Sequence, residues 1–204
     1  MRIMSRKANA FVSGTAILMV FASGALAHPG HAVQELSGNL FLAGMLHPLT
    51  GFDHLLAMLA VGLWSALTHT SLRQAILTPV CFLVLLLIGA LMGLAGIHLP
   101  GVEPMIMASL LVLGLLVASR QSMPTWLGFA MVGFFALFHG LAHAMELPHG
   151  GGAMLYVAGF MATTFVLQVL GLFAGFQLKR YSTWISGALG AGIAAYGAML
   201  FVGI

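Results

Sequence analysis

Residues 36–67 have the sequence LSGNLFLAGMLHPLTGFDHLLAMLAVGLWSAL, which contains two apolar pieces separated by a break. The first piece, Leu36 to Leu46, is too short to span a membrane, because a spanning helix needs about 20 residues. The HPLTG sequence at 47–51 follows, and proline together with glycine interrupts a helix. We therefore predict a half-helix or re-entrant element that leads into a helix beginning at Phe52.

The chain as a whole is too poor in charge to be a soluble protein. Of its 204 residues, 61% are hydrophobic and only 5% are charged, whereas soluble domains carry about 25% charged residues. Lipid must therefore be the solvent for most of its surface. There is no basic patch of the kind that nucleic-acid binding needs. The sequence also has no phosphate-binding loop, so an ATP-driven pump would need a partner subunit.

The first residues have the three parts of a secretory signal peptide. A basic start, MRIMSRK, precedes an apolar run over 11–22, and Ala25-Leu26-Ala27 fits the cleavage site. We predict a signal peptide over 1–27 and a transmembrane domain over 28–204. An uncleaved first helix is the alternative.

Five further apolar segments are long enough to be membrane helices. Together with 52–67 they make six spans after the signal peptide. The fold class predicted is an all-α, polytopic membrane helix bundle, with six spans plus the short broken element. The five segments are 75–97, 103–119, 124–146, 151–176 and 182–203.

The placement of charge supports this count of spans. With six spans and an outer N-terminus, all basic loops fall inside and all acidic segments fall outside, as the positive-inside rule requires. If 36–46 crossed the membrane, every later loop would change sides. We therefore predict an inner-membrane protein with a periplasmic mature N-terminus. The basic residues are Arg73, Arg120, Lys179 and Arg180, and the acidic ones are Glu35, Glu103 and Glu146.

Small residues spaced by four indicate close helix packing. They occur at Gly89 and Gly93, and such pairs let two membrane helices approach each other. The pattern does not distinguish packing within one chain from packing between copies, so a homo-oligomer is left open. The other two pairs are Gly171/Gly175 and Gly187/Ala191.

A first polar cluster, His47, Asp53 and His54, surrounds the break. A charged aspartate at the centre of a bilayer costs about 2.5–3.5 kcal/mol, and less near the surface. One alternative is that Asp53 only satisfies backbone N–H groups at a helix start. That role does not account for two histidines beside it.

A second cluster, His139, His143 and Glu146, has the spacing i, i+4, i+7, which places all three side chains on one helix face. Two imidazoles four residues apart can bind one divalent ion, and the carboxylate can join or orient them. The alternative is histidines that hydrogen-bond to neighbouring groups. Both clusters are predicted in the outer half of the membrane. Such ligands suit Ni²⁺, Co²⁺, Zn²⁺ or Cu²⁺, and the ligand type does not choose among these metals.

Two more histidines follow the predicted cleavage site. Cleavage would give His28 a free amine within chelating distance of its own imidazole, with His31 three residues on. We predict an outer capture site for metal there, with solvated, non-binding histidines as the alternative.

Residues 47–64 closely resemble the signature of the HupE/UreJ family, and residues 138–148 resemble its second motif. The chain has Ala144 where the family often has glycine, which leaves the ligands in place. The resemblance covers essentially the whole chain. It implies a nickel permease, in some members a cobalt permease, that serves hydrogenase or urease maturation. The metal-handling positions it implies are His47, Asp53, His54, His139, His143 and Glu146.

The function predicted is a permease or facilitator that moves Ni²⁺ or Co²⁺ from periplasm to cytoplasm. The ion is transported cargo, and neither a prosthetic group nor an enzymatic activity is expected. Two alternatives remain: an intramembrane metalloenzyme, which needs a metal-bound water and a general base, and a metal-binding accessory or sensor subunit.

Overall fold

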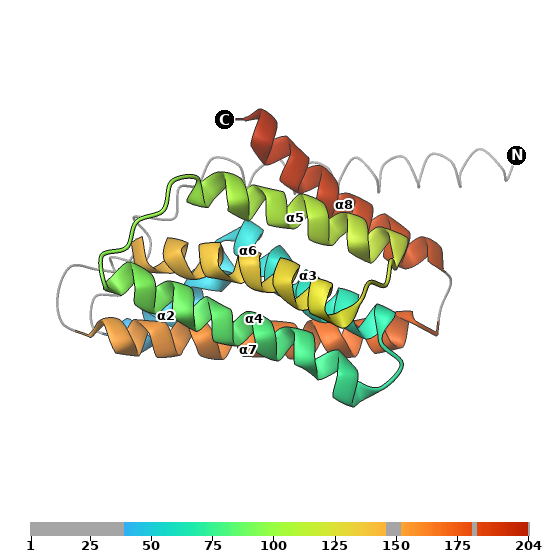
Figure 1. Cartoon of the computed structure of the whole chain (residues 1–204), viewed down its shortest axis with the longest axis horizontal. Helices are drawn as coiled ribbons and strands as arrows, with labels where there is room; N and C mark the ends of the chain where they lie inside the picture. Colours follow the sequence, from blue (N-terminus) through green and yellow to red (C-terminus); the bar gives the residue numbers. More distant parts are fainter. Residues whose placement is uncertain (1–38, 146–151, 181–182, 204) are drawn as a thin grey trace, which may run out of the picture.

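The computed structural model describes residues 39–145, 152–180 and 183–203, and these residues form α-helices and connecting loops without a strand (Figure 1). The predicted all-α bundle is confirmed. The predicted signal peptide lies outside the described residues. In chain order the helices are α2 (Leu40–Thr50), α3 (Phe52–Thr68), α4 (Leu72–Leu94), α5 (Val102–Ser119), α6 (Thr125–Met145), α7 (Ala153–Leu178) and α8 (Thr183–Val202).

The lengths of the helices agree with a chain that crosses a membrane several times. Helices α4 to α8 are each long and apolar enough to span a bilayer. Helices α2 and α3 meet at an angle of 80°, and together they pass the same test as a broken span or re-entrant element. The predicted short element before the first long helix is therefore present, and counting the bent pair as one span gives six.

The break between α2 and α3 falls at Gly51, later than the proline suggested. Pro48 lies inside the last turn of α2. That turn is closed by two hydrogen bonds to the His47 carbonyl oxygen, from the Gly51 N–H at 3.1 Å and the Thr50 hydroxyl at 3.0 Å. Gly51 itself has an extended backbone and precedes the first residue of α3. Pro48 is tolerated because it removes a single helical hydrogen bond near the end of the helix.

Helix α3 lies at the centre of the bundle. It packs against α2, α4, α5 and α7, whereas α8 packs mainly against α5 at one side (Figure 1). The side chains of Ala57, Ala60 and Val61 are completely buried, and Trp64 is only 2% exposed. Helix α3 is therefore held by its neighbours in a defined position.

Glycines let the helices of the core approach closely. A Cβ atom on Gly89 of α4 would overlap the Leu137 carbonyl oxygen of α6, and one on Gly171 of α7 would overlap the Leu59 carbonyl oxygen of α3. The predicted pairs at Gly89 and Gly171 thus pack within one chain. Gly187 of the third pair makes no such close approach within the chain, because no described atom lies within 4 Å of a Cβ added there.

The basic residues gather at one end of the bundle. Arg120, after α5, donates hydrogen bonds to the Leu178 carbonyl oxygen at 3.2 Å and to the Ser186 hydroxyl at 2.7 Å. Lys179, after α7, donates to the Ala66 carbonyl oxygen of α3 at 3.3 Å. Two tryptophans that begin α6 and α8 are 70% and 69% exposed, as in the aromatic belts at membrane surfaces. We call the end of the bundle that carries Arg120 and Lys179 the basic end.

Candidate metal site

Three buried histidines from three helices lie together away from the basic end. They are His47 in the last turn of α2, His54 in the first turn of α3 and His143 in the last turn of α6. One ligand atom from each lies within 4.8 Å of the others. Nitrogens bound to one ion at about 2 Å lie at most about 4 Å apart. Side-chain shifts of roughly 1 Å would therefore let this histidine trio bind one cation.

The bend at Gly51 brings His47 and His54 together. The two rings lie 5.6 Å apart between centroids, and each lies 4.8 Å from the ring of His143. A Cβ atom on Gly51 would lie 3.2 Å from the Asp53 carboxylate and 3.3 Å from His54 Nδ1. A larger residue would therefore crowd the groups that form the site.

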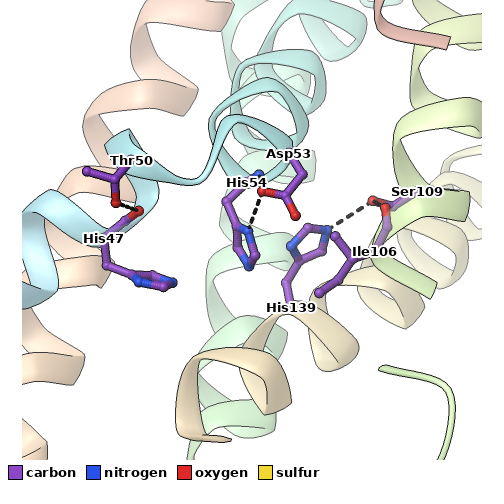
Figure 2. Close-up of polar contacts among 7 residues, drawn as sticks. All are labelled: His47, Thr50, Asp53, His54, Ile106, Ser109 and His139. Atoms are coloured by element: carbon purple, nitrogen blue, oxygen red, sulfur yellow. Dashed lines mark hydrogen bonds and ion pairs between the residues drawn. The ribbon is translucent and has the colours of Figure 1, made fainter. Parts of the chain in front are cut away.

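Asp53 orients the His54 ring (Figure 2). Its Oδ1 accepts hydrogen bonds from His54 Nδ1 at 3.0 Å and from the His54 backbone N–H at 2.9 Å. Because a carboxylate only accepts, Nδ1 carries the proton and the lone pair of the neutral ring is on Nε2. This arrangement of carboxylate and histidine is common beside metal ions, where it increases the basicity of the ligand. Asp53 thus also satisfies a backbone N–H, as the helix-start alternative proposed.

His139 lies beside the trio and is held by a serine. Its Nε2 is 2.9 Å from Ser109 Oγ, and that hydroxyl donates its own proton to the Ile106 carbonyl oxygen at 2.6 Å (Figure 2). His139 Nε2–H must then be the donor, which leaves the lone pair on Nδ1. Nδ1 is buried and has no hydrogen-bond partner among the described residues. The His139 ring lies 5.2 Å from that of His54, so His139 adjoins the trio without being part of it.

His143 is positioned by an aromatic ring. It is fully buried and stacks on Phe160 of α7, with centroids 4.3 Å apart and an angle of 16° between the rings. Neither of its ring nitrogens has a hydrogen-bond partner among the described residues. Buried polar groups are rarely left without partners, and each such group needs an explanation. A bound cation would provide one.

Comparisons with known proteins show to which family the chain belongs. The family model described as HupE / UreJ protein matches residues 16–200 of the chain. The chain belongs to the HupE/UreJ family. Protein HupE of Rhizobium leguminosarum bv. viciae is 39% identical over 188 residues, which are 92% of this chain and 97% of that protein. No solved structure matches the chain.

This HupE/UreJ protein brings most of the predicted site residues together. Residues from both predicted clusters meet, so that the histidines of α2 and α3 face those of α6. Asp53 contacts a histidine, and its side chain is 32% exposed. Metal binding by these residues stays a prediction. The residues brought together are His47, Asp53, His54, His139 and His143, whereas Glu146, His28 and His31 lie outside the described residues.

Sequence reasoning about this family member missed Ser109 and Phe160. Ser109 carries the one hydroxyl between Glu103 and Ser119 in an otherwise apolar helix, which was a usable signal. Phe160 gave none, because phenylalanine is common throughout the chain.

Proposed function

We propose that this HupE/UreJ protein is a membrane permease or facilitator that carries Ni²⁺ from the periplasm to the cytoplasm. The histidine trio is the observation that carries the proposal. Imidazole ligands suit several first-row dications, and the family resemblance favours nickel, with cobalt as the second candidate. The ion is the substrate of transport, and the proposal includes neither a prosthetic group nor a catalysed reaction.

The site has the properties that binding a partly dehydrated dication requires. An ion that enters the membrane loses water, which is very costly unless ligands and opposite charge replace it. The neutral imidazoles of His47, His54 and His143 would replace part of the hydration shell. The Asp53 carboxylate would offset part of the positive charge through His54. Release requires that this binding is not too tight.

The orientation proposed follows from the basic end. Lys and Arg side chains are enriched on the cytoplasmic side of membrane proteins, so we place the basic end in the cytoplasm and the histidine trio in the outer half. The inner membrane, the periplasmic mature N-terminus and the signal peptide over 1–27 belong to this proposal. The imported ion would then be available for hydrogenase or urease maturation.

Uptake of radioactive nickel by cells that express this chain alone tests the proposal. We expect time-dependent accumulation of the isotope, and its loss in His54→Ala and His143→Ala at unchanged membrane abundance. His98→Ala is a matched control, because His98 is an exposed loop histidine that is not part of the trio. Nickel bound by the purified protein without accumulation in cells would replace transport with an accessory or sensor role.

A further inference from the structure

Helix α7 carries two buried polar side chains that are not part of the site described so far. Thr164 is 0% exposed and Gln168 is 1% exposed. The hydroxyl of Thr164 and both polar atoms of the Gln168 amide have no hydrogen-bond partner among the described residues. Inside a membrane such groups are costly, because lipid offers them no hydrogen bonds.

These two residues lie on the basic side of the histidine trio. Phe160 of α7 stacks on His143. Thr164 and Gln168 follow Phe160 at intervals of four residues, so the three side chains share one face of α7. At 1.5 Å per residue, Thr164 and Gln168 are about 6 and 12 Å along the helix from Phe160. Helix α7 runs from the trio toward Lys179 at the basic end. An ion that leaves the trio inward would therefore meet these side chains in turn.

Neighbouring polar groups at the same depth do have partners. Thr163 donates a hydrogen bond to the Met45 carbonyl oxygen at 2.8 Å. Ser65 donates to the Ala75 carbonyl oxygen at 2.8 Å, and Pro79 leaves that oxygen without its usual helical partner. Unlike these neighbours, Thr164 and Gln168, on the face of α7 that continues from Phe160, have no partner among the described residues.

A polar cavity lies farther along the same direction. A Cβ atom on Gly62 of α3 would overlap the Gln168 carbonyl oxygen, which puts these two residues at one level of the bundle. Thr68 follows Gly62 by six residues, or about 9 Å toward the basic end. Thr68, His69 and Thr78 line a cavity of about 130 Å³ there. Residues of α3, α4, α6 and the loop before α6 line this cavity, so polar groups are also present on other helices nearer the basic end.

We propose that Thr164 and Gln168 form an inner relay for the transported dication, between the histidine trio and the basic end. The hydroxyl and amide oxygens would contact the ion or its remaining water molecules. Oxygen ligands hold late first-row dications less tightly than imidazole does, so the ion would pass on without being trapped. This inference rests on the proposed transport function and adds a route to it.

Apolar replacements of similar shape separate this role from a structural one. Thr164→Val and Gln168→Met remove polar groups that lack partners, so the folded protein should be as stable as the wild type or more so. In vesicles containing the purified full-length protein, we expect the initial rate of ⁶³Ni²⁺ uptake to fall about tenfold, as for one lost hydrogen-bonding partner at the barrier. Thr164→Ser keeps the hydroxyl and should retain transport.

Two controls make the result decisive. Thr163→Val removes a neighbouring hydroxyl that has a structural partner, and it should leave the uptake rate per folded protein unchanged. Calorimetric titration of Ni²⁺ into the detergent-purified variants should give the wild-type affinity, because the histidine trio is intact. Wild-type uptake rates in Thr164→Val and Gln168→Met, or an equal loss of Ni²⁺ binding, would overturn the relay. Vesicles in which the wild-type protein moves no nickel would refute the proposed function itself.

Discussion

Replacing Asp53 by Asn removes a negative charge beside His54 and keeps the shape of the side chain. Asp53 Oδ1 accepts two hydrogen bonds from His54, one from the ring at 3.0 Å and one from the backbone at 2.9 Å. An amide oxygen can still accept both, but it no longer increases the basicity of the ring as a carboxylate does. Loss of such a partner of a metal ligand lowers metal affinity about 10–100-fold, which corresponds to roughly 1.4–2.8 kcal/mol.

Calorimetric titration of Ni²⁺ into the detergent-purified Asp53→Asn protein measures this change. Glu103→Gln is the matched control, because Glu103 is also an acidic residue in the first turn of a helix and is exposed. We expect its affinity to equal that of the wild type. The reasoning about Asp53 is wrong if Asp53→Asn binds nickel with wild-type affinity, or if Glu103→Gln loses as much. A lower melting temperature with unchanged affinity would indicate a purely structural role at the helix start.

Three further predictions concern packing and topology. Gly140→Ala should destabilise the bundle by about 1–3 kcal/mol, because the new methyl group overlaps the backbone of α4. Gly187→Ala should have little effect on the melting temperature in detergent, because no described atom lies within 4 Å of the new methyl group. Reporter proteins fused after Arg120 should be cytoplasmic and those fused near His98 periplasmic, and a periplasmic result at Arg120 would overturn the six-span topology. N-terminal sequencing of the mature protein should begin at His28, whereas a start at Met1 would disprove cleavage.

The local parts of the site were predictable from the sequence. His47, Asp53 and His54 lie within eight residues of one another around a break that the length of the apolar piece and the presence of glycine both indicate. Helical spacing also placed His139 and His143 on one face of α6. These predictions depend on short-range geometry, which a sequence pattern expresses directly.

The roles of individual histidines depend on the neighbouring helices, which the pattern does not show. His139 and His143 are one turn apart, about 6 Å along the helix axis. That distance places His139 beside Ser109 of α5, and His143 beside His47 of α2 and Phe160 of α7. The sequence also placed the break too early, because hydrogen bonds to the His47 carbonyl oxygen keep Pro48 within α2.

The histidine trio joins segments that the ribosome makes at different times. His143 follows His54 by 89 residues, and at about 5–20 residues per second its synthesis comes roughly 4–18 s later. A nascent chain in which only α2 and α3 have been inserted contains two of the three imidazoles. The third arrives when α6 enters the membrane and packs against α4. The nickel binding proposed for the trio therefore requires the nearly complete chain, so acquisition of the ion would follow biogenesis rather than guide it.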